Sequence, residues 1–215
     1  MEKELLIKGL LSLEIGPSDF IVNSFVTYLH ELKKWNKAYN LTALTKNEDI
    51  IIKHFIDSLL YLKAIPEINS SLVTPHPSLF VCDIGSGAGF PGAALAIVRP
   101  DLNITLIEPS RKKAAFLRNL KRTLSLNNVE VMESRVEDVT DRQFDIALTR
   151  ALFSISDIIK KAGHVLKGNG LFVLSKGPKL EEETKQLGPD IKCEVLTVPL
   201  PLTSQQRHIV TVQVV

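Results

Sequence analysis

Three alternating glycines, Gly85, Gly87 and Gly89, stand directly after an apolar run that ends at Ile84. Glycine tolerates positive φ angles and lets a ligand approach the main chain closely. Pro91 suits the first turn of a helix, and the unpaired N–H groups of such a turn attract anionic or polar ligands. A buried strand, a glycine-rich turn and a helix therefore predict a loop that binds a nucleotide-like ligand.

Two classes of enzyme use such a loop. Dinucleotide-binding enzymes favour G-x-G-x-x-G from the turn onward, but counting from Gly85 the sixth position is Phe90. Enzymes that use S-adenosylmethionine (AdoMet) favour G-x-G-x-G, which the three glycines supply. A shifted frame from Gly87 to Gly92 does satisfy the dinucleotide pattern, and a simple tight turn is a third interpretation. The glycines alone leave the choice open.

Glu108 is the last residue of the next strand-like run, and its position favours a nucleoside as the ligand of the glycine loop. It follows Gly85 at roughly the 20-residue spacing at which an acid accepts hydrogen bonds from ribose hydroxyl groups in α/β folds. A solvated acid at a strand end is the alternative interpretation. Asp83, directly beneath the loop, is a second candidate, for the amino group of AdoMet.

Basic residues gather between positions 111 and 122, where no acid interrupts them. Arg111, Arg118 and Arg122 recur at helical spacing, and Lys112 adjoins them. The net charge of +2 is too small to indicate nucleic-acid binding by itself. This stripe is therefore either a solvated helix face or a surface for phosphate groups.

The elements that position these residues change in kind along the chain. The first 65 residues read as helical, with apolar residues at helical spacing over 18–38 and again over 47–64. Ser18 is the expected cap of the first of these helices. The stretch 69–78 contains two prolines and is the expected boundary. We expect an N-terminal helical extension, 1–70, packed on an AdoMet-binding domain, 71–215.

From residue 79 onward, strand-like runs alternate with helical ones, which indicates a parallel sheet with helices on both faces. The expected strands are 79–84, 103–108, 129–133, 144–149, 171–175, 193–198 and 208–215, and the expected helices are 91–98, 112–124 and 155–166. The last two strands have no helix between them, so they predict an antiparallel hairpin at a sheet edge. The predicted fold class is α/β: a Rossmann-like AdoMet-dependent methyltransferase fold, with a mostly parallel seven-stranded sheet, an antiparallel C-terminal strand and N-terminal helices.

Polar residues that follow later strands extend the candidate site, because open α/β sheets bind ligands beside the carboxyl ends of their strands. Arg150 and Lys176 end adjacent strands and suit a nucleotide phosphate or base. Asn40 and Thr42, between the two N-terminal helices, either read a base edge or cap the next helix. Arg150, Lys176 and Asn40 are the candidate catalytic residues. The polar side chains of segment 54–58 either bond among themselves or contact substrate or cofactor.

Two catalytic motifs of known methyltransferases are missing, and their absence reduces the range of atoms that could accept a methyl group. Amine methylation of adenine or cytosine uses an Asp/Asn-Pro-Pro-Tyr/Phe clamp, but residues 149–152 read TRAL. Methylation of C5 of a pyrimidine needs a nucleophilic cysteine, and Cys82 and Cys193 lie within apolar or strand-like runs. We expect both to be reduced thiols, with no metal site. Acceptors with an available lone pair, or oxygens beside a base, remain.

Three segments closely resemble the RsmG (GidB) family: WNKAYNLT at 35–42, HFIDS at 54–58 and DIGSGAGFPG at 83–92. Shorter matches follow in the same order at 135–137, 150–151, 176–177 and 207–208, so the resemblance spans nearly the whole chain. Two positions depart from the family pattern. Thr149 stands where the family often has serine, and Val215 is the last residue, short of a basic tail residue that many members carry.

The resemblance implies a bacterial methyltransferase that acts on N7 of a guanine in 16S ribosomal RNA, with AdoMet as its cofactor. It implies that AdoMet is bound by Gly85, Phe90, Val136, Glu137 and Arg150. Guanine N7 carries a lone pair and no proton, so it can attack the sulfonium methyl directly. No general base is needed, and the site must mainly hold donor and acceptor in line.

With this resemblance, the basic helix is expected to contact the RNA backbone through Arg111, Lys112, Arg118 and Arg122, joined by Arg207. The expected partner is 16S rRNA or the small ribosomal subunit. The chain shows no signal peptide or membrane-spanning run, so we expect it in the cytoplasm. A monomer is a separate expectation. The alternatives are a methyltransferase for a small molecule or protein, and a non-catalytic AdoMet-fold or dinucleotide-binding regulator.

Overall fold

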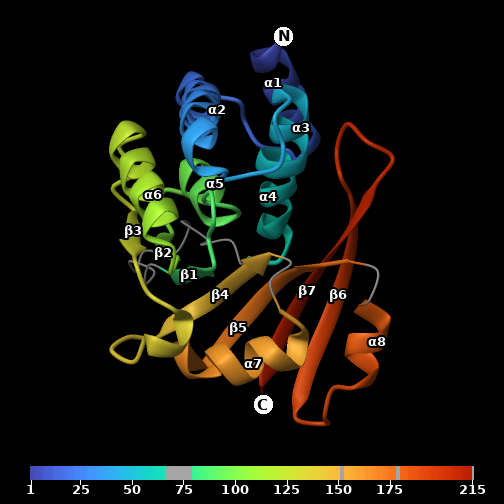
Figure 1. The fold of residues 1–215 in the computed structure, drawn as a ribbon. Coiled ribbons are helices and arrows are strands. Elements are labelled where there is room, and N and C mark those ends of the chain that lie inside the picture. The colour runs from blue at the N-terminus through green and yellow to red at the C-terminus, as the bar shows by residue number, and fades with distance from the viewer. Residues whose placement is uncertain (66–78, 151–152, 178–179, 215) are drawn as a thin grey trace, which may run out of the picture.

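The computed structural model describes residues 1–65, 79–150, 153–177 and 180–214. Its centre is a seven-stranded sheet with the order β3-β2-β1-β4-β5-β7-β6 (Figure 1). The strands are β1 (Phe80–Ile84), β2 (Asn103–Ile107), β3 (Val129–Met132), β4 (Phe144–Arg150), β5 (Leu166–Lys176), β6 (Ile191–Pro199) and β7 (Gln206–Val214).

The strand pairing confirms the predicted fold class. β1 pairs in parallel with both β2 and β4, and the β2–β3 and β4–β5 pairs are parallel as well. β7 runs antiparallel to β5 and to β6, so the last two strands form the expected hairpin at the sheet edge. The chain leaves β1 toward β2 and β3 and then returns to β4. β1 and β4 therefore flank the topological switch point, where open α/β sheets bind their ligands.

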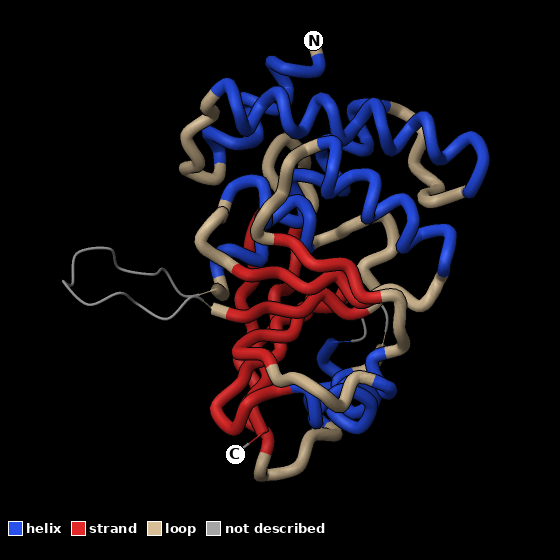
Figure 2. Tube along the Cα trace, turned by 90° about the vertical axis from the view of Figure 1, so that its left-hand side faces the viewer, coloured by secondary structure: helices blue, strands red, loops and turns tan. Residues whose placement is uncertain are grey.

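Helices cover both faces of the sheet. α5 (Gly92–Val98) and α6 (Arg111–Thr123) lie on the same face as the N-terminal helices, whereas α7 (Ile155–Ala162) and α8 (Leu180–Lys185) lie on the other (Figure 1). Each face has its own buried apolar cluster, one centred on Phe116 and Leu148 and the other on Phe172 and Ile158. Figure 2 shows the thicker helical layer of the first face from the side.

The N-terminal part contains α1 (Glu2–Ser12), α2 (Asp19–Tyr39) and a helical run from residue 47 to 63. The Ser18 hydroxyl accepts a hydrogen bond from the Ile21 N–H at 3.3 Å, which confirms the predicted cap. The later run is α3 (Asn47–Ile50), a π-helical turn (Ile51–Ile56), α4 (Asp57–Leu59) and a 3-10 turn (Leu60–Lys63).

The π-helical turn departs from the regular helix expected over 47–64. Two side chains donate hydrogen bonds to carbonyl oxygens of this widened turn. Arg150 Nη2 donates to the Lys53 oxygen at 2.6 Å, and Ser58 Oγ donates to the His54 oxygen at 2.6 Å. Such turns often occur at functional sites. The first of these donors comes from the end of β4, so the turn is tied to the carboxyl edge of the sheet.

The N-terminal helices share one continuous apolar cluster with the sheet. Phe25 and Tyr28 of α2 pack against Phe55, with ring centroids 5.1 and 5.0 Å apart, and Phe55 lies 5.8 Å from Phe90 after β1. The expected boundary at 69–78 lies outside the described residues, so the division into two domains stays a prediction.

Several element bounds differ from those expected. The helix expected over 155–166 ends at Ala162, and β5 begins at Leu166, because Leu166 already pairs with Phe144 across an irregularity in the ladder. α1 and α8 had not been singled out as separate helices. None of the helices that the structure describes has both the length and the apolar character required to cross a bilayer.

Candidate active site

The glycine loop forms the turn expected between β1 and α5. Gly85, Gly87 and Gly89 have φ angles of 70°, 58° and 92°, which L side chains rarely adopt. The Gly85 N–H donates to the Ile107 oxygen at 2.8 Å and thereby ties the loop to the end of β2. The Gly89 N–H donates to the Ser86 oxygen at 2.7 Å and closes the turn. The loop thus lies at the carboxyl edge of the sheet, beside the switch point.

The glycines of this loop serve different purposes. Of the atoms of the described residues, a Cβ built on Gly87 would have only the Gly85 carbonyl oxygen nearby, at 3.8 Å. A Cβ on Gly89 would collide with the Tyr28 hydroxyl, and one on Gly92 would lie 2.5 Å from Leu106 Cδ2. Gly89 and Gly92 therefore allow α2 and the sheet to pack closely, whereas Gly87 lies in a less crowded part of the loop.

Replacing Gly89 by alanine is expected to lower the free energy of unfolding by about 2–4 kcal/mol, because a positive φ and a collision with Tyr28 coincide there. Denaturant titration of the two proteins measures this difference. Gly163→Ala is the matched control, since a Cβ at Gly163 meets nothing within 4 Å. Equal losses in the two variants would contradict the assigned packing role of Gly89.

Glu108 faces the glycine loop and bonds its main chain. Its Oε2 accepts the Gly87 N–H and its Oε1 accepts the Ser110 N–H, both at 2.8 Å. The residue is only 4% exposed. A carboxylate oxygen can accept more than one hydrogen bond, so both oxygens keep capacity for the hydroxyl groups of a ribose.

Asp83 supports the loop from beneath. Its Oδ2 accepts the Gly92 N–H at 2.8 Å at the start of α5, and the residue is fully buried. Its Oδ1 has no hydrogen-bond partner among the described residues. Burial raises the pKa of this carboxyl to about 7. Asp83 Oδ2 thus bonds the start of α5, and a contact of Asp83 with the amino group of AdoMet stays a prediction.

His54 connects the segment after α2 with the glycine loop. Its ring stacks on Phe90 with a centroid distance of 4.5 Å and an interplanar angle of 18°, and its Nε2 lies 2.7 Å from Thr42 Oγ1. Burial, and then the positive charge of Arg150, lower the pKa of His54 to about 4. The imidazole is therefore neutral at physiological pH. Phe90 also stacks on Tyr28, at 5.3 Å and 9°.

His54 and Asp83 are expected to give the stability opposite dependences on pH. Between pH 4 and 6.5 only the unfolded chain holds a proton at His54, so this group makes the unfolding free energy rise with pH. Between pH 3.8 and 7 only the folded chain holds one at Asp83, so this group makes it fall. The effect over its window is about 3 kcal/mol for His54 and about 4 kcal/mol for Asp83.

Denaturant titrations from pH 4 to 7 separate the two contributions. His54→Gln should lose the rising contribution, so its unfolding free energy should fall with pH relative to wild type. Asp83→Asn should lose the falling contribution and show the opposite deviation. Three parallel curves would show that neither group titrates differently in the folded and the unfolded chain.

A buried carboxylate joins two arginines at the carboxyl edge of the sheet. Asp57 Oδ2 lies 3.0 Å from Arg150 Nη2, and Asp57 Oδ1 accepts from Arg207 Nε at 2.8 Å. Asp57 is 5% exposed. Arg150 Nη1 is buried and has no hydrogen-bond partner among the described residues. One guanidinium nitrogen at the switch point thus still has hydrogen-bonding capacity.

The other two candidate catalytic residues have different surroundings. Lys176, whose side chain is 7% exposed, donates to the Phe153 oxygen at 2.5 Å and pairs with Glu183 at 2.7 Å, so its ammonium links the segment before α7 to α8. Asn40 is exposed and ends α2 in a left-handed conformation with φ 50°. It caps α2, not the next helix. Neither contact tests a role in the reaction, which stays a prediction.

Val136 and Glu137 form a 3-10 turn (Val136–Asp138) shortly after β3. Val136 is 4% exposed, and Glu137 pairs with Lys161 of α7 at 3.0 Å. The peptide of these two residues is thus held at the same edge of the sheet as the glycine loop, where the family resemblance expects cofactor contacts.

The basic stripe lies on α6 as expected, with its apolar face buried. Arg111, Lys112, Arg118 and Arg122 are exposed. Arg118 pairs with Glu133 at 2.9 Å, and Arg122 donates to Asn119 at 3.2 Å. Lys112 Nζ lies 5.9 Å from the centroid of the Tyr39 ring at the end of α2. Arg207, by contrast, belongs to the Asp57 cluster on β7.

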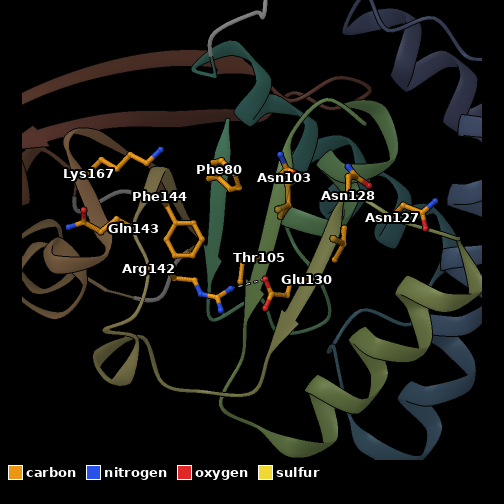
Figure 3. Close-up of a pocket in the computed structure, with 12 residues that line it drawn as sticks. Phe80, Asn103, Thr105, Asn127, Asn128, Glu130, Arg142, Gln143, Phe144 and Lys167 are labelled. Atoms are coloured by element: carbon orange, nitrogen blue, oxygen red, sulfur yellow. Dashed lines mark hydrogen bonds and ion pairs between the residues drawn. The ribbon is translucent and has the colours of Figure 1, made fainter. Parts of the chain in front are cut away.

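A cleft of about 420 Å³ at the opposite edge of the sheet does not belong to this site. Figure 3 shows Phe80, Asn103 and Phe144, which begin β1, β2 and β4, along its wall, with Arg142 paired to Glu130. The glycine loop follows the carboxyl end of β1. The cleft and the loop are therefore at opposite ends of the same strands.

Two contributors to the site were not predicted from the sequence. Tyr28, which donates to the Ala88 oxygen at 2.5 Å, lies in the apolar stripe of α2 and reads as an ordinary core residue. Asp57 belongs to the HFIDS segment at 54–58, but its two arginine partners come from β4 and β7, and no local spacing indicates them.

Comparison with known proteins identifies the family. Residues 21–210 match the family model GidB, described as rRNA small subunit methyltransferase G. Ribosomal RNA small subunit methyltransferase G of Neisseria meningitidis is 37% identical over 209 residues, which cover 97% of this chain and 96% of the relative. The protein of the same name from Caldanaerobacter subterraneus is 36% identical and covers 98% and 89%.

A solved structure shares the fold at low sequence identity. The SAM-dependent O-methyltransferase TM0748 from Thermotoga maritima superimposes with a TM-score of 0.54 at 16% identity, over 87% of this chain and 71% of that one. This likeness confirms the Rossmann-like methyltransferase fold, and the near full-length matches above identify the family within it. The chain therefore belongs to the rRNA small subunit methyltransferase G family and is a methyltransferase.

Proposed function

We propose that this chain transfers the methyl group of AdoMet to N7 of a guanine in 16S ribosomal RNA. The observation that carries the cofactor assignment is the Glu108 carboxylate, which faces the open Gly87 position beside the switch point of the sheet. Family membership supports the ribosomal RNA substrate. The missing amine clamp and the absence of a suitably placed cysteine in the sequence favour a ring nitrogen as the acceptor.

The residues of the loop fit an AdoMet nucleoside. Glu108 offers acceptor capacity to the ribose hydroxyl groups, and Gly87 has no side chain to exclude the ligand. Arg150 Nη1 is a buried donor that lacks a partner among the described residues, as expected of a group that awaits a polar ligand. When bound, AdoMet supplies an electrophilic methyl on a sulfonium sulfur.

The task of the chain is then positioning and exclusion of water. Guanine N7 needs no deprotonation, so the neutral imidazole of His54 suits this site, because it adds no charge beside the sulfonium. Asp57 holds Arg150 in place. Alignment of two reactants by such a rigid frame lowers the activation free energy by several kcal/mol.

The substrate surface is proposed to extend from the loop over α6. Its exposed arginines and Lys112 suit RNA phosphates, while Arg207, bonded to the same carboxylate as Arg150, suits a phosphate nearer the reacting base. Binding through such contacts weakens as salt concentration rises.

Nucleoside analysis tests this proposal. Small ribosomal subunits from a strain that lacks the enzyme are incubated with the protein and AdoMet, and the 16S RNA is then digested and analysed by mass spectrometry. We expect one added 7-methylguanosine per subunit. A methyl group on another base or atom would overturn the N7 assignment. No transfer to subunits or to naked 16S RNA would overturn the RNA substrate and favour a small molecule or a protein.

A further inference from the structure

A pocket of about 330 Å³ lies between the C-terminal half of α2 and the segment that leads into α3. The buried side chains of Leu32 and Ile50 give it an apolar floor. Lys33 and Lys37 line it from α2, and Thr45 lines it from the other side. Among the described residues, the lining contains two lysines and no carboxylate. An apolar floor with a polar and cationic rim suits a flat, polar-edged and anionic ligand.

The inner wall of this pocket is connected to the cofactor loop. Thr42 lines the pocket, and its Oγ1 lies 2.7 Å from His54 Nε2. The His54 ring stacks on Phe90, which ends the glycine loop, at 4.5 Å. A single imidazole thus separates the pocket wall from the residue that the family resemblance assigns to AdoMet.

The position of this wall is fixed by a reciprocal pair of hydrogen bonds. Asn36 Nδ2 donates to the Thr42 oxygen at 3.0 Å, and the Thr42 N–H donates to Asn36 Oδ1 at 2.9 Å. The Leu44 N–H donates to Thr42 Oγ1 at 3.1 Å. The segment therefore has a defined shape before any ligand arrives, which lowers the entropic cost of binding.

An exposed aromatic ring of α2 lies next to the lining in sequence. Tyr39, 43% exposed, directly precedes the lining residue Asn40, and Lys112 Nζ of α6 lies 5.9 Å from the centroid of the Tyr39 ring. An exposed aromatic ring with cations beside it is a common platform for unpaired bases, which stack on the ring while their phosphates contact the cations.

We propose that this pocket holds an unstacked nucleotide of the RNA substrate, its base over the Leu32–Ile50 floor and its phosphate near Lys37. The inference rests on the proposed function, because it assumes an RNA substrate, and it adds a subsite that the cofactor loop and α6 do not include. Thr42 and His54 then couple the occupied pocket to the position of Phe90.

Two substitutions test the subsite in the full chain. Thr45→Trp fills the pocket from an exposed position, and Lys37→Ala removes one of its cations. Lys34→Ala is the matched control, because Lys34 is an exposed lysine of the same helix outside the lining. Both pocket variants should raise the KM for small subunits by about tenfold while the Kd for S-adenosylhomocysteine stays unchanged. Lys34→Ala should change neither quantity more than twofold.

Pocket variants with KM values within twofold of wild type, or a loss equal to that of Lys34→Ala, would overturn the subsite. An equal loss of S-adenosylhomocysteine binding would show that the substitutions damage the cofactor site and would overturn it as well. These outcomes are read separately from the proposed function, which fails if the wild-type chain transfers no methyl group to ribosomal RNA or transfers it to a position other than guanine N7.

A binding measurement addresses the subsite without catalysis. A 16S RNA fragment that carries 6-thioguanosine is irradiated with the wild-type chain, and the crosslinked peptide is identified by mass spectrometry. We expect a crosslink within residues 33–45 that Thr45→Trp abolishes. Crosslinks confined to other peptides, or one in this segment that persists in Thr45→Trp, would contradict occupation of the pocket.

Discussion

Replacing Glu108 by alanine is expected to raise the Kd for AdoMet by about 5- to 150-fold, which corresponds to about 1–3 kcal/mol. The substitution removes the acceptor for the ribose hydroxyl groups and also leaves the Gly87 and Ser110 N–H groups without their partner. Loop geometry and ligand contact are therefore lost together. Isothermal titration calorimetry with AdoMet and with S-adenosylhomocysteine measures the effect.

Two comparisons separate these contributions. Glu108→Gln keeps one acceptor oxygen but replaces the other with an amide donor. Its Kd for AdoMet should therefore lie between those of wild type and Glu108→Ala. Glu130→Ala removes an exposed carboxylate from β3 whose partner is Arg142, far from the loop, and should bind AdoMet as wild type does. If Glu108→Ala also bound AdoMet with the wild-type Kd, the ribose would have to be held elsewhere.

Replacing Asp57 by alanine is expected to lower the free energy of unfolding by about 3–5 kcal/mol, the usual cost of removing one partner from a buried ion pair. The carboxylate is 5% exposed and bonds both Arg150 and Arg207. Without it, two guanidinium groups from β4 and β7 face each other at the sheet edge. Denaturant titration at neutral pH measures this loss.

The affinity of the Asp57→Ala variant for AdoMet tests whether Asp57 positions Arg150. If Asp57 positions Arg150 for the cofactor, AdoMet binding should weaken under conditions in which the variant is still folded. Glu194→Ala is the control, because the Lys192–Glu194 pair is exposed at 63% and 67% and should contribute at most about 1 kcal/mol. Similar losses of stability in both variants would show that the Asp57 cluster behaves as a surface ion pair.

The sheet could be predicted from the sequence because its signals are local. Apolar runs separated by single helical segments indicate parallel strands, and the missing helix before β7 indicated the final hairpin. Bounds were less accurate where tertiary contacts decide them. β5 begins at Leu166, ahead of the predicted residue 171, because Phe144 of β4 offers a pairing partner there, and the sequence does not show that partner.

The candidate site divides in the same way. The glycine loop and Glu108 were predictable, because both follow strands at a fixed spacing and meet at one edge of the sheet. The π-helical turn around His54 was not, since the Arg150 side chain that donates to the Lys53 oxygen in it is 97 positions away in the sequence. The three-way contact of Asp57 with Arg150 and Arg207 likewise depends on the completed fold.

The lysine at the end of β5 illustrates the limit of strand-end reasoning. Lys176 and Arg150 end neighbouring strands, yet Lys176 forms bonds with Glu183 and the Phe153 oxygen. Arg150 pairs with Ser175, the residue before Lys176, and adjacent side chains of a strand point to opposite faces of the sheet. The spacing of the strands in the sequence does not tell which partners the rest of the chain brings to each face.

Calorimetric titration of the wild-type chain with AdoMet and, separately, with NADH tests most directly whether the glycine loop and Glu108 form an AdoMet site. We expect saturable binding of AdoMet and of S-adenosylhomocysteine at one site per chain and no heat of binding for NADH. Binding of NADH without binding of AdoMet would contradict the assignment, because the shifted glycine frame from Gly87 to Gly92 would then be the one in use.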